Sequence, residues 1–128
     1  MLLIHDLGEI DAGDTIVYES NTLEVKADED AGFRRVIGLL PVEDQEEYLV
    51  LWEEFEAART PEARYAKAID RIPPLLHNLH GEGHSWREHA IPAEKVYALN
   101  SKIQDGSQAA WDVLKRELDD AVSRGILL

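Results

Sequence analysis

The 128-residue sequence contains no cysteine, a single methionine and half as many basic residues as acidic ones. Without cysteine there is no disulfide framework and no thiolate metal site, so nitrogen and oxygen atoms must hold any metal ion. The 13 Lys and Arg against 26 Asp and Glu give a formal net charge of −13. Nucleic-acid polymers are disfavoured as partners, because their binding depends on basic side chains that displace counterions. A small phosphorylated ligand held by a metal remains compatible with this charge.

The sequence also lacks any apolar run long enough to cross a membrane. Residues 1–4 carry neither the basic region nor the cleavage site of a signal peptide. We therefore expect a cytoplasmic protein without membrane contact. The 45% of apolar residues and the three tryptophans predict one packed domain over residues 1–128.

Apolar residues recur at helical spacing along most of the chain, and no segment alternates polar and apolar residues with period two. We expect a loop or short extended piece at 15–22, a connection at 84–91, and helices over residues 23–40, 42–58, 60–80, 92–104 and 107–125. The first helix is expected to bury Ala31, Val36, Ile37 and Leu40. The pattern predicts an all-α fold of five or six helices.

Residue types at the helix boundaries support these limits. Pro41 and Pro92 suit the starts of helices, and Thr60-Pro61 and Ser107 supply capping hydroxyls. Gly81-Glu82-Gly83 is expected to end the helix that contains Pro73-Pro74.

The densest chemistry lies at His5-Asp6, followed by three further carboxylates up to residue 14. An imidazole nitrogen beside a carboxylate oxygen is a good ligand pair for Mn, Fe, Co or Zn. Adjacent side chains cannot enclose an ion by themselves, so other helices must contribute ligands. Asp70 is the candidate, because a carboxylate among apolar neighbours is costly unless it is paired or binds a metal. The alternative is an ion pair of Asp70 with Lys67 or Arg71.

The pattern His-Asp-x-x-Glu-x-x-x-Gly-Asp from His5 and the segment Ala-Lys-Ala-Ile-Asp-Arg-Ile around Asp70 together resemble the HD-domain metal-dependent phosphohydrolases. The similarity is to their 5′-deoxynucleotidase-like branch, and it extends over Leu39-Leu40-Pro41, residues 51–56 and residues 100–111. The resemblance implies an HD-type helical bundle. It also implies a hydrolase that releases phosphate from (deoxy)nucleoside 5′-monophosphates or similar small phosphomonoesters, and that acts as a homodimer.

The resemblance assigns roles to single residues. His5, Asp6 and Asp70 match metal ligands for a divalent ion (Mn, Co, Fe, Zn or Mg). Glu9 matches the acid that orients or deprotonates the attacking water. Asp14 matches a second catalytic acid near the leaving group. For Asp14, a turn or capping role after Gly13 is the alternative.

One part of the family pattern has no counterpart in this sequence. The family places a first metal-binding histidine on an earlier helix, and residues 1–4 resemble the interior of the helix that leads into the His-Asp pair. We therefore expect an N-terminally incomplete domain, either shortened or naturally degenerate. We expect weak metal binding and impaired activity from this form. The alternative functions are a non-catalytic helical dimerisation or interaction module and an enzyme for cyclic or polyphosphorylated nucleotides.

Four histidines, at 77, 80, 84 and 89, could suggest a second metal site. His77 lies two turns beyond Asp70, about 10 Å along a continuous helix, too far to share its ion. We expect these histidines to be surface residues. Trp52, Phe55, Trp86 and Trp111 are expected to be core or interface anchors rather than platforms for base stacking.

Overall fold

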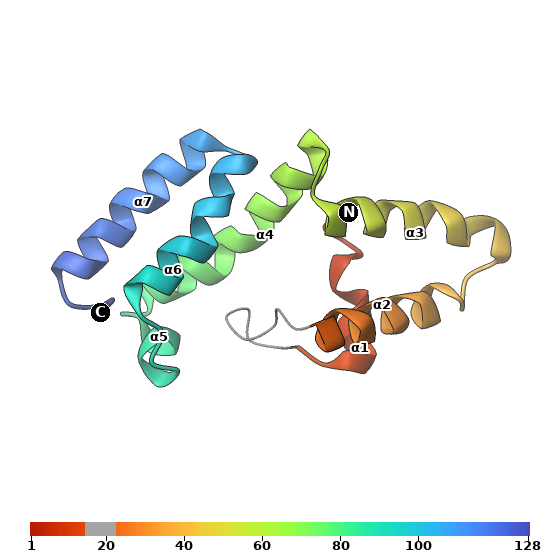
Figure 1. Ribbon diagram of the computed structural model, residues 1–128, viewed down its shortest axis with the longest axis horizontal. Helices are drawn as coiled ribbons and strands as arrows, with labels where there is room; N and C mark the ends of the chain where they lie inside the picture. The colour runs from red at the N-terminus through yellow and green to blue at the C-terminus, as the bar shows by residue number, and fades with distance from the viewer. Residues whose placement is uncertain (15–22) are drawn as a thin grey trace. The chain divides into compact units, whose positions relative to one another are not determined.

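The computed structural model describes residues 1–14 and 23–128, and these residues form helices joined by turns, with no strand among them. Figure 1 labels the α-helices in chain order. The elements, including two 3-10 helices, are η1 (His5–Gly8), α1 (Glu9–Ala12), α2 (Leu23–Ile37), α3 (Val42–Ala57), α4 (Pro61–His80), α5 (His84–Glu88), α6 (Ala93–Asn100), η2 (Ser101–Asp105) and α7 (Gln108–Ser123). The all-α prediction is confirmed.

Most predicted boundaries are confirmed as well. Pro41 and Pro92 occupy the residues immediately before α3 and α6, and Ser107 caps α7 by accepting a hydrogen bond from the Ala110 amide. Two details differ. The expected connection at 84–91 contains the short helix α5, and residues 1–4 form turns rather than helix, with i to i+3 hydrogen bonds. The segment 15–22 lies outside the described residues.

The chain divides into two compact units, Met1–Ala63 and Arg64–Leu128. The first unit contains 17 Asp and Glu against four Lys and Arg, whereas the second contains nine of each. The whole formal charge of −13 therefore belongs to the first unit. The expected single domain over residues 1–128 stays a prediction.

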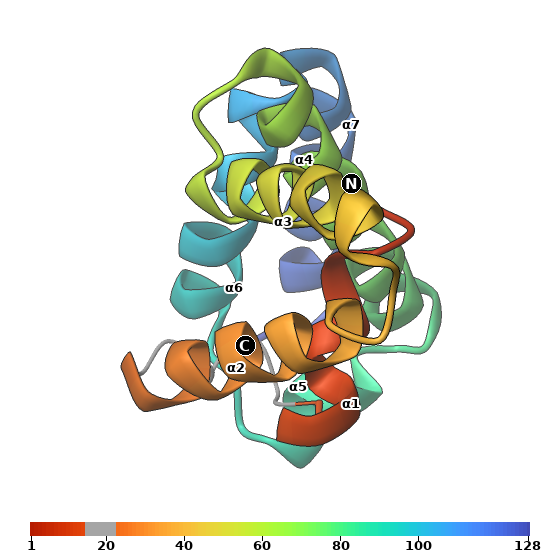
Figure 2. The same cartoon turned by 90° about the vertical axis from the view of Figure 1, so that its right-hand side faces the viewer.

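In the first unit, two glycines bring α2 unusually close to the segment that carries His5. A Cβ atom on Gly32 would lie 2.4 Å from the Gly8 carbonyl oxygen, and one on Gly8 would lie 2.5 Å from the Glu29 carbonyl oxygen. Both distances are shorter than any side chain tolerates, so the two backbones meet only because neither residue has a Cβ. Figures 1 and 2 show η1 between α2 and α3.

An aromatic pair forms the centre of the first unit. The rings of Phe33 and Trp52 stack with centroids 4.7 Å apart, and Ile37 completes the buried cluster, against which Ile4, Leu7, Tyr48 and Leu49 pack. The predicted buried stripe of α2 is therefore only partly right. Ala31 and Leu40 are exposed, and Gly32 and Phe33 are buried in their place, because the contact with Gly8 turns α2 toward η1.

Two arginines of α2 tie the helices of the first unit together at the surface. The Arg34 guanidinium donates to Asp30 on its own helix and to Glu53 on α3, the latter at 2.9 Å. Arg35 binds Asp11 of α1 through both of its carboxylate oxygens. Exposed pairs of this kind add little stability each, so they fix orientation more than they hold the unit together.

The second unit is built around the apolar face of α7. Trp111, Leu114, Leu118 and Ala121 are buried at helical spacing, and Trp86 of α5 is 2% exposed. At the surface, the Tyr97 hydroxyl of α6 donates to Asp119 of α7 at 2.5 Å, and Figure 1 shows the two helices alongside each other. The predicted burial of Trp52, Phe55, Trp86 and Trp111 is confirmed. No helix in residues 1–14 and 23–128 has the length and apolar character needed to cross a membrane.

The contact between Gly8 and Gly32 gives a stability prediction. Gly32→Ala should destabilise the protein by about 2 kcal/mol, because the methyl group meets backbone that cannot rotate away, although alanine favours a helix by about 1 kcal/mol. Urea unfolding followed by circular dichroism measures the difference. The matched control is Ala31→Leu, which adds more volume at the neighbouring exposed position of α2. A Gly32→Ala variant as stable as the wild type would show that this contact is dispensable.

Candidate metal and acid site

His5 opens the 3-10 helix η1, and its imidazole is held on two sides. The Nδ1–H donates to the Leu2 carbonyl at 2.7 Å, and the ring packs against Phe55 of α3 with centroids 4.8 Å apart. The side chain of His5 is 13% exposed. Because Nδ1 donates to the backbone, the ring presents Nε2 as its coordinating atom, an arrangement typical of metal-binding histidines.

The Nε2 atom of His5 lies 2.9 Å from Oδ1 of Asp6, which is an ion pair when the imidazole is protonated. Two ligand atoms bound about 2.1 Å from one metal ion at a right angle are separated by about 3 Å. The spacing therefore fits a shared divalent ion, and the donor set of one imidazole and one carboxylate suits a first-row metal. Asp6 is 64% exposed, which leaves its second oxygen accessible.

Glu9 follows one turn after this pair, as the first residue of α1. Burial raises the pKa of the Glu9 carboxyl to about 7, and repulsion from Asp6, Asp14 and Glu29 adds to the effect, against a smaller opposing influence of His5. A carboxyl group that titrates near neutral pH can both accept and return a proton. The structure thus brings Glu9 into the electrostatic range of Asp6 and Asp14.

Glu29 is the residue of this cluster that sequence reasoning missed. It lies on α2, and its backbone packs directly on Gly8. The only sequence signal was its spacing of three residues from Gly32, which places the two on the same face of a helix. That spacing indicates that Glu29 lies near Gly8 only once α2 is known to contact η1.

Asp14 follows Gly13, whose φ of 82° ends α1, and it is exposed. The Gly13 amide donates to the Glu9 carbonyl at 2.8 Å. Gly13 therefore ends α1 one helical turn after Glu9. The structure is compatible with both expected roles of Asp14, as an acid near Glu9 and as a turn residue.

Asp70 belongs to the second unit and lies half-buried in the middle of α4. The helix continues through Pro73 and Pro74. Proline has no N–H, so the helical hydrogen bonds from positions 73 and 74 to the carbonyls of Ile69 and Asp70 are absent. The backbone of α4 is thus weakened at the turn that carries the candidate ligand.

No group of three or more His, Asp or Glu side chains close enough to hold a metal ion occurs in the described part of the chain. The local geometry supplies the pair His5 and Asp6, whereas a joint site with Asp70 stays a prediction. The four histidines at 77, 80, 84 and 89 are exposed, as expected. Glu88 lies 3.7 Å from His84 and 3.9 Å from His89, measured between Oε2 and each Nε2.

The chain is similar in sequence to one curated protein, which is found in three mammals. The chain is 31% identical over 77 residues to the 5′-deoxynucleotidase HDDC2 of Bos taurus, which covers 59% of this chain and 38% of the bovine protein. The mouse and human proteins of that name are each 30% identical over 77 residues. The matched region therefore spans about two fifths of the length of these relatives.

A solved structure is similar over nearly the whole chain. The crystal structure of a predicted metal-dependent phosphohydrolase from Magnetospirillum magnetotacticum MS-1 is 42% identical and superposes with a TM-score of 0.90, covering 98% of this chain and 64% of that protein. The family model of the HD domain matches residues 1–111. The chain therefore belongs to the HD domain family.

Proposed function

We propose that this chain carries the catalytic part of a metal-dependent phosphohydrolase that releases phosphate from deoxynucleoside or nucleoside 5′-monophosphates. The observation that carries the proposal is the His5–Asp6 pair, with Nε2 and Oδ1 2.9 Å apart and Nδ1 fixed by the Leu2 carbonyl. Membership of the HD domain family and the similarity to the 5′-deoxynucleotidase HDDC2 support it.

In this proposal His5, Asp6 and Asp70 hold the divalent ion, which would be Mn, Co, Fe, Zn or Mg. Bound there, such an ion polarises a phosphoryl oxygen and lowers the pKa of a water molecule. The Leu2 carbonyl keeps the imidazole of His5 in the tautomer that presents Nε2. Asp70 contributes the ligand from the second unit.

The carboxyl of Glu9 handles the proton of the attacking water. Burial and the neighbouring acids raise its pKa to about 7, so its carboxylate is a stronger base than an ordinary glutamate. Asp14, which follows the turn at Gly13, assists the departing alcohol oxygen of the nucleoside. These roles divide proton transfer between two carboxyl groups of one segment.

A non-catalytic interaction module is the second candidate, and exposed apolar side chains favour it. Leu39 and Val42, in and after the turn between α2 and α3, are 77% and 81% exposed, and Leu3 is 98% exposed. Large exposed apolar groups are typical of surfaces that bind another protein. A second copy of the chain, as in the expected homodimer, would be one such partner.

The hydrolase is tested by phosphate release from a panel of ribonucleoside and deoxyribonucleoside 5′-monophosphates with Mn²⁺ or Co²⁺. We expect Asp6→Asn and Asp70→Asn to lower kcat/KM by about 100-fold or more, because each removes a metal ligand, and Glu9→Gln to lower kcat by about 100-fold or more. A chelator should abolish activity. Asp28→Asn, at an exposed position of α2, is the control and should stay within about twofold. Hydrolysis that survives both ligand substitutions contradicts the proposal, and absence of any hydrolysis favours the interaction module.

The pKa of Glu9 predicts a pH dependence of stability in the metal-free protein. Because this pKa is raised in the folded state to about 7, the folded protein binds the proton more tightly than the unfolded chain does. The contribution of Glu9 is therefore most favourable below about pH 4.5 and is lost as the pH rises to about 7.

Urea unfolding in chelator, at several pH values between 5 and 8, measures this dependence. The free energy of unfolding should fall less steeply with pH in Glu9→Gln than in the wild type. Glu117→Gln, which changes an exposed acid of α7, is the control and should keep the wild-type slope. Equal slopes in the wild type and Glu9→Gln would show that the Glu9 carboxyl titrates alike in the folded and unfolded states.

A further inference from the structure

The short helix α1 carries Glu9 but has little that would hold it in place by itself. A single helical turn is not stable as an isolated helix in water. None of the four residues of α1 is buried, and the Ile10 side chain is 64% exposed. Gly8, at the start of α1, has no side chain that could cap it. The position of the Glu9 carboxyl therefore depends on contacts that α1 makes with other elements.

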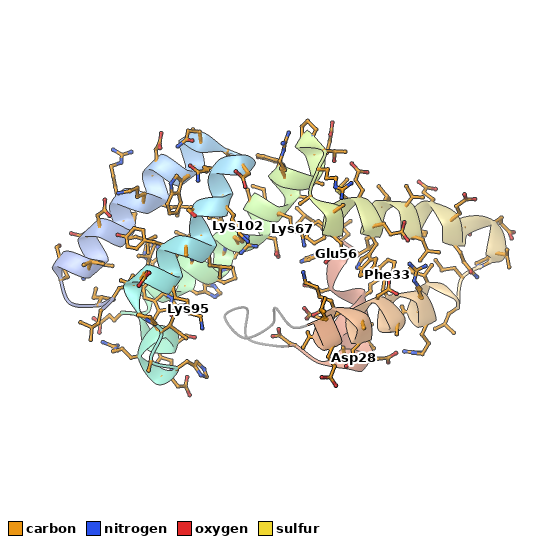
Figure 3. All side chains as sticks on the ribbon, in the orientation of Figure 1. Asp28, Phe33, Glu56, Lys67, Lys95 and Lys102 are labelled. Atoms are coloured by element: carbon orange, nitrogen blue, oxygen red, sulfur yellow. The ribbon has the colours of Figure 1, made fainter. Side chains whose placement is uncertain are left out.

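Gly32 and Arg35 lie on the side of α2 that meets α1. They are three positions apart, so they are neighbours on the surface of the helix. A Cβ atom on Gly32 would lie 3.5 Å from the Asp11 Cβ, and Figures 1 and 2 show α1 beside α2. Figure 3 labels Phe33, whose ring packs on Trp52 of α3. The helix α2 therefore contacts α3 through one residue and α1 through its neighbours.

The Arg35 guanidinium binds both carboxylate oxygens of Asp11, with 2.8 Å between Nη2 and Oδ1. Asp11 follows Glu9 by two residues within α1. A planar guanidinium that binds both oxygens fixes the orientation of a carboxylate as well as its distance. These hydrogen bonds also lower the pKa of the Asp11 carboxyl, so the pair stays charged at neutral pH. The Arg35–Asp11 pair thus fixes how α1 is placed on α2.

We propose, on the basis of the phosphohydrolase function above, that Arg35 is a positioning residue that holds Glu9 in its reactive place by binding Asp11. Arg35 acts through α1 and not on the substrate. A general base must lie within hydrogen-bond reach of the proton that it accepts, and a displacement of about 1 Å can lower a rate by about 100-fold. Exposed ion pairs add little to the free energy of unfolding. Loss of this pair should therefore reduce the rate while the fold is kept.

Arg35→Gln and Asp11→Asn test the pair from its two ends. Each should lower kcat for a nucleoside 5′-monophosphate with Mn²⁺ by about threefold to tenfold and leave KM within about twofold, because only the placement of Glu9 changes. The two substitutions change the net charge in opposite directions, so an effect of charge alone would move kcat in opposite directions. The double variant should be no slower than the slower single variant, because both remove the same contact. Arg35→Lys, which keeps the charge without the planar fork, should be intermediate.

Solvent exchange of the Gly13 amide, measured by nuclear magnetic resonance of the full 128-residue chain, tests the pair without substrate or metal. This amide donates to the Glu9 carbonyl at 2.8 Å, so its exchange reports whether the turn of α1 is closed. Arg35→Gln and Asp11→Asn should each accelerate the exchange by about twofold to fivefold. Added salt should bring the wild-type rate toward that of the variants, because the pair is exposed.

Arg34→Gln is the matched control. It removes the same charge from the neighbouring residue of α2, whose partners are Asp30 and Glu53 rather than a residue of α1. Both kcat and the exchange of the Gly13 amide should stay within about 1.5-fold of the wild type. The melting temperatures of Arg35→Gln and Asp11→Asn should stay within about 3 °C of the wild type. If Arg35→Gln folds poorly, Asp11→Asn provides the test, because it removes the charge and keeps the size of the side chain.

The outcomes separate this proposal from the proposed function. Faster exchange of the Gly13 amide in both variants, in a chain without hydrolase activity, supports the placement of α1 by Arg35 and counts against the hydrolase. Hydrolysis with unchanged exchange in both variants overturns the positioning role of Arg35 alone. Opposite shifts of kcat in Arg35→Gln and Asp11→Asn, or equal effects of Arg34→Gln, overturn it as well.

Discussion

The close approach of Gly8 and Gly32 is the constraint on which the first unit depends. A backbone contact without Cβ atoms sets the distance between α2 and the segment His5–Ala12. It also brings Glu29 against the turn that precedes Glu9. Packing elsewhere in this unit follows from it, because Phe33, next to Gly32, is thereby directed onto Trp52. Because glycine has no side chain, the two backbones can approach closely, and this close approach fixes the positions of the neighbouring groups.

Placement matters here because the acidic groups around Glu9 repel one another. Asp6, Asp14 and Glu29 all raise the pKa of Glu9. Only a rigid backbone keeps like charges together in the absence of a cation, and Arg35 on Asp11 and Arg34 on Glu53 reinforce it from outside the cluster. In the proposed hydrolase, this mutual repulsion would favour a bound positive ion and proton transfer near neutral pH.

The two units differ in charge. The first carries the whole net charge of −13, and the second is balanced. An acidic unit can supply metal-binding oxygens but repels a phosphate. The weakened hydrogen-bond ladder of α4 at Pro73 and Pro74 falls in the same helix as Lys67 and Asp70.

Sequence alone determined the helical character, most helix limits and the residues of the His-Asp pattern, because these depend on local spacing, on caps such as Ser107 and on prolines such as Pro41 and Pro92. It could not decide which face of α2 is buried, since Gly32 offers no apolar side chain to reveal a contact. It likewise missed Glu29. Only the tertiary structure decided these points, because they follow from two backbones that meet across residues far apart in the chain.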